Sequence, residues 1–248
     1  MAPITLRFVG SGDSFGSGGR LQTCLHLSGA GEGSLLLDCG ASSLVGLKRL
    51  ALDPSEIGWV LLTHLHVDHF GGVPFLVLDG QFSRRTRPLI VAGPPGTRAR
   101  IEATMELLFP GSTAVTRRFA TEWIELPPGV ATPVGPTRVT GHPVEHASGA
   151  TPYALRVEWA GRTVTYSGDT EWTDGLVDAA RDADLFVCEA YTFDTPRRYH
   201  LDYRTLAANR ARLSCRRLVL THMGPEMLAR RAEADAECAE DGLVVTVG

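Results

Sequence analysis

The stretch "LLTHLHVDHFGG", residues 61–72, decides how this chain is interpreted, because it holds three of the eight histidines and an aspartate within six positions. Alternation along an extended chain would place His64 and His66 on one side, with Asp68 and His69 on the turn beyond. Two groups of ligands suit two metal ions, whereas one structural zinc needs four ligands and usually recruits cysteine. The stretch therefore indicates an open, catalytic metal site and not a closed structural one.

The composition is that of an ordinary globular protein, with 44% apolar and 21% charged residues. We expect the 248 residues to form a single domain, 1–248. A net charge of −4 and a single lysine, Lys48, give no bulk electrostatic reason for tight nucleic-acid binding. The five cysteines form no C-x-x-C pair, and neither a signal-peptide pattern nor a membrane-length apolar run is found, so a reducing, cytoplasmic location is expected.

Strand-like and helix-like segments alternate along the chain. Two β-rich halves, each followed by helices, suggest two sheets packed together with helices outside, and the Pro/Gly-rich segment 127–136 connects the halves. Strands are expected over 4–10, 34–40, 58–64, 88–94, 184–190, 217–224 and 242–248, and helices over 42–52, 96–109, 202–214 and 225–241.

Further candidate ligands lie at the ends of apolar strands downstream. His146 ends "TRVTGHPVEH", Asp169 ends "RTVTYSGD" and His222 ends "RLVLTH". A single residue of this kind could be a surface polar group. Because strand ends that meet at one edge of a sheet bring distant side chains together, the recurrence predicts one shared site.

With these residues in place, the chain resembles the metallo-β-lactamase superfamily of metallohydrolases, through "THLHVDH" and the later ligands in order. The resemblance implies an α/β fold, the four-layer αββα sandwich, with a site for two divalent metal ions. Zinc is the expected metal, with manganese as the alternative. On this resemblance His64, His66 and His146 would hold the first ion, Asp68, His69 and His222 the second, and Asp169 would bridge them.

The segments "RFVGSGDSFGSGGRLQTC", "HPVEHASGATPYALRV" and the stretch 189–222 are similar to the ribonuclease Z-like branch of that superfamily. The match implies that His200 is an additional active-site histidine and that Glu189 orients it, with Asp68 contributing to catalysis as well as to metal binding. Leu201 follows this histidine directly, where the branch usually has a serine or threonine soon afterwards.

The sequence departs from true ribonuclease Z enzymes in one respect. Those enzymes carry a long tRNA-gripping arm between the third histidine and the bridging aspartate, whereas His146 and Asp169 are only 23 positions apart. We therefore expect a small phosphodiester or a short nucleic acid as substrate, and no tight tRNA binding. No membrane partner is expected, and a homodimer is an open alternative by analogy with the branch.

Two other functions stay open at this stage. The same motif occurs in hydrolases of lactones, thioesters and β-lactams, and in non-catalytic relatives from cofactor biosynthesis. The glycine-rich loop 10–19 is not a nucleotide-binding P-loop and is expected to rim the metal cleft, with Asp13 as a supporting acid. His142 and His26 are expected to be structural.

Overall fold

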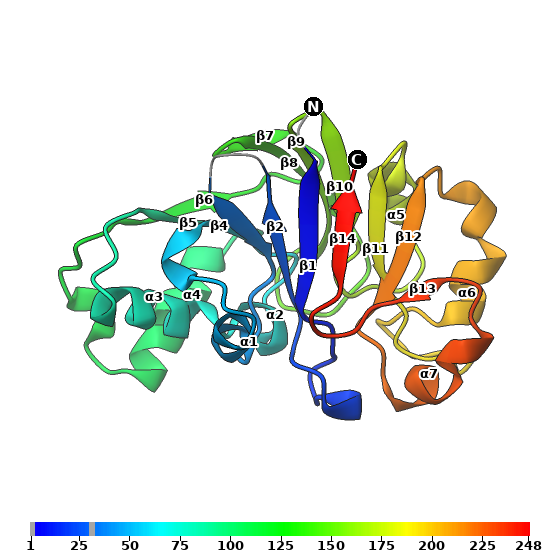
Figure 1. Ribbon diagram of the computed structural model, residues 1–248, viewed down its shortest axis with the longest axis horizontal. Helices are drawn as coiled ribbons and strands as arrows, with labels where there is room; N and C mark the ends of the chain where they lie inside the picture. Colours follow the sequence, from blue (N-terminus) through cyan, green and yellow to red (C-terminus); the bar gives the residue numbers. More distant parts are fainter. Residues whose placement is uncertain (1–2, 30–32) are drawn as a thin grey trace.

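The computed structural model describes residues 3–29 and 33–248. Within them the chain forms two mixed sheets of seven strands each (Figure 1). The order of the first sheet is β14-β1-β2-β3-β4-β5-β6. Its strands are β1 (Ile4–Gly10), β2 (Cys24–Ser28), β3 (Ser34–Leu37), β4 (Ile57–Leu61), β5 (Leu89–Gly93), β6 (Thr121–Glu125) and β14 (Val244–Val247).

The second sheet has the order β13-β12-β11-β10-β9-β8-β7. Its strands are β7 (Thr132–Val134), β8 (Thr137–Pro143), β9 (Tyr153–Trp159), β10 (Arg162–Tyr166), β11 (Leu185–Glu189), β12 (Arg217–Thr221) and β13 (Glu237–Cys238). The expected connecting segment 127–136 carries the chain from the first sheet to the second, but its residues 132–134 already form β7.

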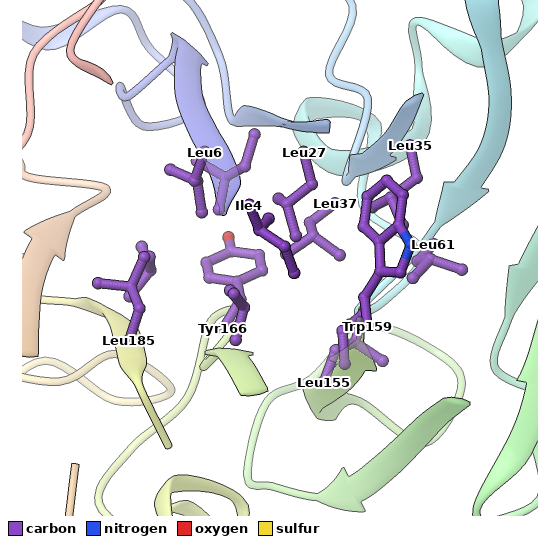
Figure 2. Packing of buried hydrophobic residues seen from close by; sticks show 14 of the residues in the cluster. Ile4, Leu6, Leu27, Leu35, Leu37, Leu61, Leu155, Trp159, Tyr166 and Leu185 are labelled. Carbon is purple, nitrogen blue, oxygen red and sulfur yellow. The ribbon is translucent and has the colours of Figure 1, made fainter. Parts of the chain in front are cut away.

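The two sheets bury one apolar layer between them. Leu6, Leu27 and Leu37 of the first sheet face Leu155 and Tyr166 of the second, and each is at most 1% exposed (Figure 2). Alternate residues of each strand point into this layer, because side chains alternate between the two faces of a sheet. Burial of this continuous apolar surface is what holds the sheets face to face.

Helices cover the outer faces and complete the αββα sandwich that the sequence predicts. Those of the first half pack on the first sheet through Leu47, Val77 and Ile101, and those of the second half pack on the second sheet through Leu176 and Met227 (Figure 1). The helices are α1 (Ser43–Arg49), α2 (Val67–Phe70), α3 (Val73–Phe82), α4 (Thr97–Leu108), α5 (Asp174–Ala180), α6 (Tyr203–Ala208) and α7 (Pro225–Arg230). Short 3₁₀ turns are η1 (Ser17–Gly19), η2 (Pro54–Glu56), η3 (Ser112–Ala114), η4 (Arg210–Arg212) and η5 (Arg231–Glu233).

All four expected helices are shorter in the structure, the two of the second half by the most. The expected helix 225–241 is wrong beyond residue 230, because residues 237–238 form β13 and pair with the open edge of β12, a tertiary contact. The expected helix 202–214 stops at residue 208. The side-chain amide of Asn209 donates to the carbonyl of Thr205 at 3.0 Å, which closes the last turn.

The direction of the strands brings their carboxyl ends to one edge. β3, β4, β5 and β6 run parallel to one another, and so do β10, β11 and β12. The loops that leave these strands therefore emerge together, where α2 also lies in Figure 1. In the described ranges, no helix has the length and hydropathy needed to cross a membrane.

Candidate metal centre

One cluster at this edge joins Asp68, His69, Asp169 and His222. The Nε2 atom of His69 lies 3.4 Å from Oδ2 of Asp68 and 3.3 Å from Oδ1 of Asp169. The Nε2 atom of His222 lies 3.5 Å from Oδ2 of each aspartate. The four side chains are buried, so two imidazoles and two carboxylates face one another away from bulk water.

A second cluster, of His64, His66 and His146, adjoins the first. The Nε2 atom of His146 lies 3.0 Å from Nδ1 of His66. Both His64 and His146 place Nε2 4.0 Å from Oδ2 of Asp169. Asp169 therefore stands between the two clusters: Oδ1 faces His69, and Oδ2 faces His222 of the first cluster as well as His64 and His146 of the second.

Hydrogen bonds fix which ring nitrogen of three histidines faces the clusters. Nδ1 of His69 donates to Asp38 at 2.5 Å, and Nδ1 of His146 donates to the carbonyl of Tyr199 at 2.7 Å. The Thr63 hydroxyl donates to Asp38 and can accept from Nδ1 of His64 at 3.0 Å. These contacts occupy Nδ1 and leave Nε2 of each ring as the nitrogen that faces the clusters, the arrangement that metal-ligating histidines show.

The backbone around the clusters leaves little room. A Cβ on Gly40 would lie 2.2 Å from the carbonyl oxygen of Asp68, so only glycine lets the two loops approach so closely. His222 has a φ of 55°, a left-handed conformation that is costly for a non-glycine residue. Its N–H donates to the carbonyl of Ser11 at 3.1 Å, which holds this conformation.

The ligands of the stretch 64–69 do not lie on a continued strand. β4 ends at Leu61, and the ligands lie on the following loop and on α2.

The electrostatics of the site favour cations. Burial by itself lowers the pKa of His69, but Asp169, Asp38 and Asp68 outweigh it and hold that pKa well above its ordinary value. Burial by itself raises the pKa of Asp169, but His222 and His69 outweigh it and hold that pKa well below its ordinary value. A buried site that draws protons in this way also attracts metal ions, which compete for the same nitrogen atoms.

The donor atoms fit such ions. Five buried atoms in the clusters have no hydrogen-bond partner: Nε2 of His64, His69 and His222, Nδ1 of His222, and Oδ1 of Asp169. An unpartnered buried polar atom costs free energy, and coordination to a cation would remove that cost. Imidazole nitrogen and carboxylate oxygen without cysteine suit an open catalytic site for divalent metal.

His200 lies beside the clusters on the segment after β11. Its Nδ1 atom is 3.0 Å from Oε2 of Glu189 and 4.0 Å from Oδ2 of Asp169. Glu189 is fully buried, and the backbone N–H of Thr170 donates to its other oxygen. Burial by itself lowers the pKa of His200, but the hydrogen bond that the ring donates to Glu189, together with the charge of that carboxylate, outweighs burial and raises the pKa to about 9.

Two side chains at the site were not singled out from the sequence. Asp38 accepts from His69 and from both the N–H and the hydroxyl of Thr63. It follows the strand "SLLL", so the rule that flagged the other strand-end residues applies to it as well. The Ser14 hydroxyl donates to Oδ2 of Asp68, so the loop 10–19 borders the site as the sequence predicts, although Ser14 itself was not singled out.

Three other residues considered from the sequence, Asp13, His142 and His26, lie outside the two clusters. Asp13 accepts hydrogen bonds from Phe15 and Ser17 of its own loop, and so shapes the loop and does not support a ligand. His142 is on β8, beside Arg156 and Asp178 in a cleft away from the clusters. His26 lies buried on β2 next to Arg7 of β1.

The interval between His146 and Asp169 is described in full and contains no arm. It consists of β9, β10 and their connecting turns. The hairpin turns at Ala160 and Gly161, which have φ angles of 49° and 77°. Two consecutive left-handed residues are typical of a tight two-residue turn.

An αββα sandwich with a cluster of histidines and aspartates at its strand ends is characteristic of the metallo-β-lactamase class of metallohydrolases. Residues 34–223 match the family model described as the beta-lactamase superfamily domain, and the chain belongs to this family. Its relatives place it in the ribonuclease Z-like part of the superfamily.

Three similar proteins illustrate the relationship. An uncharacterised protein of Mycobacterium leprae is 33% identical over 86% of this chain and 75% of its own length. A ribonuclease Z of Methanosarcina acetivorans is 29% identical over 89% of this chain and 87% of its own. The crystal structure of human tRNase Z, short form, superposes with a TM-score of 0.79 at 25% identity, over 98% of this chain and 99% of that one.

Proposed function

We propose that this metallohydrolase is a phosphodiesterase that uses two divalent metal ions, most readily zinc, and acts on a small or short phosphodiester. The observation that carries the proposal is the position of Asp169 between two groups of histidines, with His200 and Glu189 at their side. His64, His66 and His146 would hold one ion, Asp68, His69 and His222 the other, and Asp169 both. The whole chain, 1–248, would act as a single domain.

Bound divalent ions would supply Lewis acidity, which withdraws charge from phosphoryl oxygens and lowers the pKa of a water molecule. The chain's own residues supply orientation and protons. Glu189 fixes the proton on Nδ1 of His200, so that the opposite ring nitrogen can donate to a phosphoryl oxygen or to the leaving oxygen. The Ser14 hydroxyl donates to Oδ2 of Asp68, whose second role would be to orient the attacking water.

The proposed substrate is small because a clamp for a large one is missing where true ribonuclease Z enzymes have it. The hairpin β9–β10 fills the interval between His146 and Asp169. A net charge of −4 also gives little long-range attraction for a polyanion such as tRNA. The similarity to ribonuclease Z of Methanosarcina acetivorans and to human tRNase Z, short form, supports phosphodiester chemistry in general.

The test is a substrate panel on one preparation whose metal content is measured. It comprises bis(p-nitrophenyl) phosphate, cyclic ribose phosphates, cyclic nucleotides, short RNA and precursor tRNA, set against a lactone, a thioester and nitrocefin. We expect hydrolysis of phosphodiesters that disappears on metal removal and returns with zinc or manganese. Hydrolysis of the lactone, thioester or nitrocefin without any phosphodiester hydrolysis would contradict the proposal, and metal-free folded protein would favour a non-catalytic role.

A further inference from the structure

An aromatic ring stands exposed at the rim of the metal centre. The Ser14 hydroxyl donates to Oδ2 of Asp68, so the loop after β1 touches a proposed ligand directly. The next residue, Phe15, is 85% exposed, more than any other large apolar side chain of the described ranges. The loop, dark blue in Figure 1, projects at the same end of the sandwich as α2. The loop that carries this ring therefore borders the two clusters, where a substrate would enter.

The loop holds this ring in a defined position. The Asp13 carboxylate accepts from the N–H of Phe15 at 3.2 Å, and from the N–H and hydroxyl of Ser17 at 2.9 and 2.6 Å. The side-chain amide of Gln22 donates to the carbonyl of Ser14 at 3.1 Å. A loop tied at these points keeps Phe15 outside the core, so its exposure is built into the backbone.

The surroundings of Phe15 indicate what the ring would contact. Its neighbours along the loop are Ser14, Gly16, Ser17, Gly18 and Gly19, which offer almost no apolar side-chain area. A protein partner would need a broad apolar patch around such a residue. A lone ring on a polar, glycine-rich loop suits a flat ligand that needs one face only, such as a nucleobase.

We propose that Phe15 is a stacking platform for the base of a nucleotide substrate. The stacked base would belong to the nucleoside that keeps the phosphate after the leaving group departs. This inference rests on the proposed phosphodiesterase function and narrows its substrate class to nucleotides. Phe15 is a specificity-determining residue here and takes no part in the bond-breaking step. Base–aromatic stacking tolerates any base, so the residue selects for nucleotides without selecting a sequence.

The experiment compares two substrates with the same leaving group. One is thymidine 5′-(p-nitrophenyl phosphate), and the other is its abasic dideoxyribose analogue, which keeps the sugar and lacks the base. For Phe15→Ala we expect KM for the thymidine ester to rise about tenfold, with kcat little changed, since loss of one stack weakens binding on that scale. KM for the abasic ester should stay as in the wild type, and Phe15→Trp should restore tight binding of the thymidine ester.

The matched control is Phe82→Ala, which removes a ring that is 81% exposed at the end of α3. It should leave both KM values unchanged, and metal content and circular dichroism should be equal for all variants. Equal losses on the two esters, or no loss on either, would overturn the stacking role and leave the phosphodiesterase proposal intact. A wild type that hydrolyses neither ester nor bis(p-nitrophenyl) phosphate would overturn both.

Discussion

The imidazole of His200 and the carboxylate of Glu189 form a fixed pair, with Nδ1 and Oε2 3.0 Å apart. Glu189 is buried completely and is held by the backbone N–H of Thr170, so it cannot turn away from the histidine. His200 is instead 24% exposed at its side chain and faces the cleft. A buried acceptor that fixes Nδ1 of a partly exposed histidine is consistent with the role proposed for His200, donation to the substrate.

His200→Gln should therefore lower kcat by roughly a hundredfold to a thousandfold, the usual contribution of a positioned general acid. Metal content should stay at the wild-type value, because the residue is not among the proposed ligands. Both quantities are measured on the same sample, with bis(p-nitrophenyl) phosphate as substrate. The control is His142→Gln, which replaces a histidine in the cleft beside α5 and should change neither. Loss of metal in His200→Gln would show that this histidine is a ligand.

Asp169→Ala should remove most of both metal equivalents, because this carboxylate stands between the two histidine groups. The remaining histidines would keep only one carboxylate among them, that of Asp68 in the first cluster, and the second cluster would keep none. Metal analysis after gel filtration measures the loss, and Asp178→Ala, an exposed aspartate on α5, serves as the control. Two full equivalents in Asp169→Ala would show that the bridging role is wrong.

Asp38→Asn should weaken metal binding by about ten- to a hundredfold, although Asp38 is not a proposed ligand. Its carboxylate accepts three hydrogen bonds, one from His69 and two from Thr63, and an amide cannot accept all three. His69 would then lose the orientation of its Nε2. Competition with a chromogenic chelator gives the dissociation constant, and Asp53→Asn, at the start of η2, should bind metal as the wild type does.

The cluster could be anticipated from the sequence because its members share two local signals, a metal-competent side chain and a position just after an apolar strand. Asp38 carries the same signals, but its partner His69 is 31 positions away, and only the fold shows that they meet. The carbonyl of Tyr199, which orients His146, could not be anticipated at all, since every residue has a carbonyl.

The helix predicted over 225–241 is too long because a contact between segments that are distant in sequence ends it early. The segment has helical composition, and propensity alone would continue the helix past Arg230. Pairing of Cys238 with Leu220 on β12 overrides that preference, because the edge of the sheet gains a hydrogen-bonded neighbour. Local pattern therefore anticipated the layers and most elements, and failed where a contact distant in sequence decides the outcome.

His26 is buried on β2, where it is only 7% exposed. Burial, and next the charge of Arg7, lower its pKa from 6.5 to about 4. The unfolded chain therefore takes up a proton between these two pH values while the folded chain does not. Neutral His26 leaves stability intact above pH 6.5, and stability is lost progressively as the pH falls towards 4, by at most about 2 kcal/mol at pH 5.

His26→Gln removes the titrating group and should flatten this dependence. The free energy of unfolding is measured with urea at pH 7.5 and pH 5 for the wild type and the variant, both metal-free so that metal release does not contribute. We expect the wild type to lose up to about 2 kcal/mol more than the variant between the two pH values. An equal loss in both proteins would mean that His26 is protonated as readily in the folded chain as in the unfolded one.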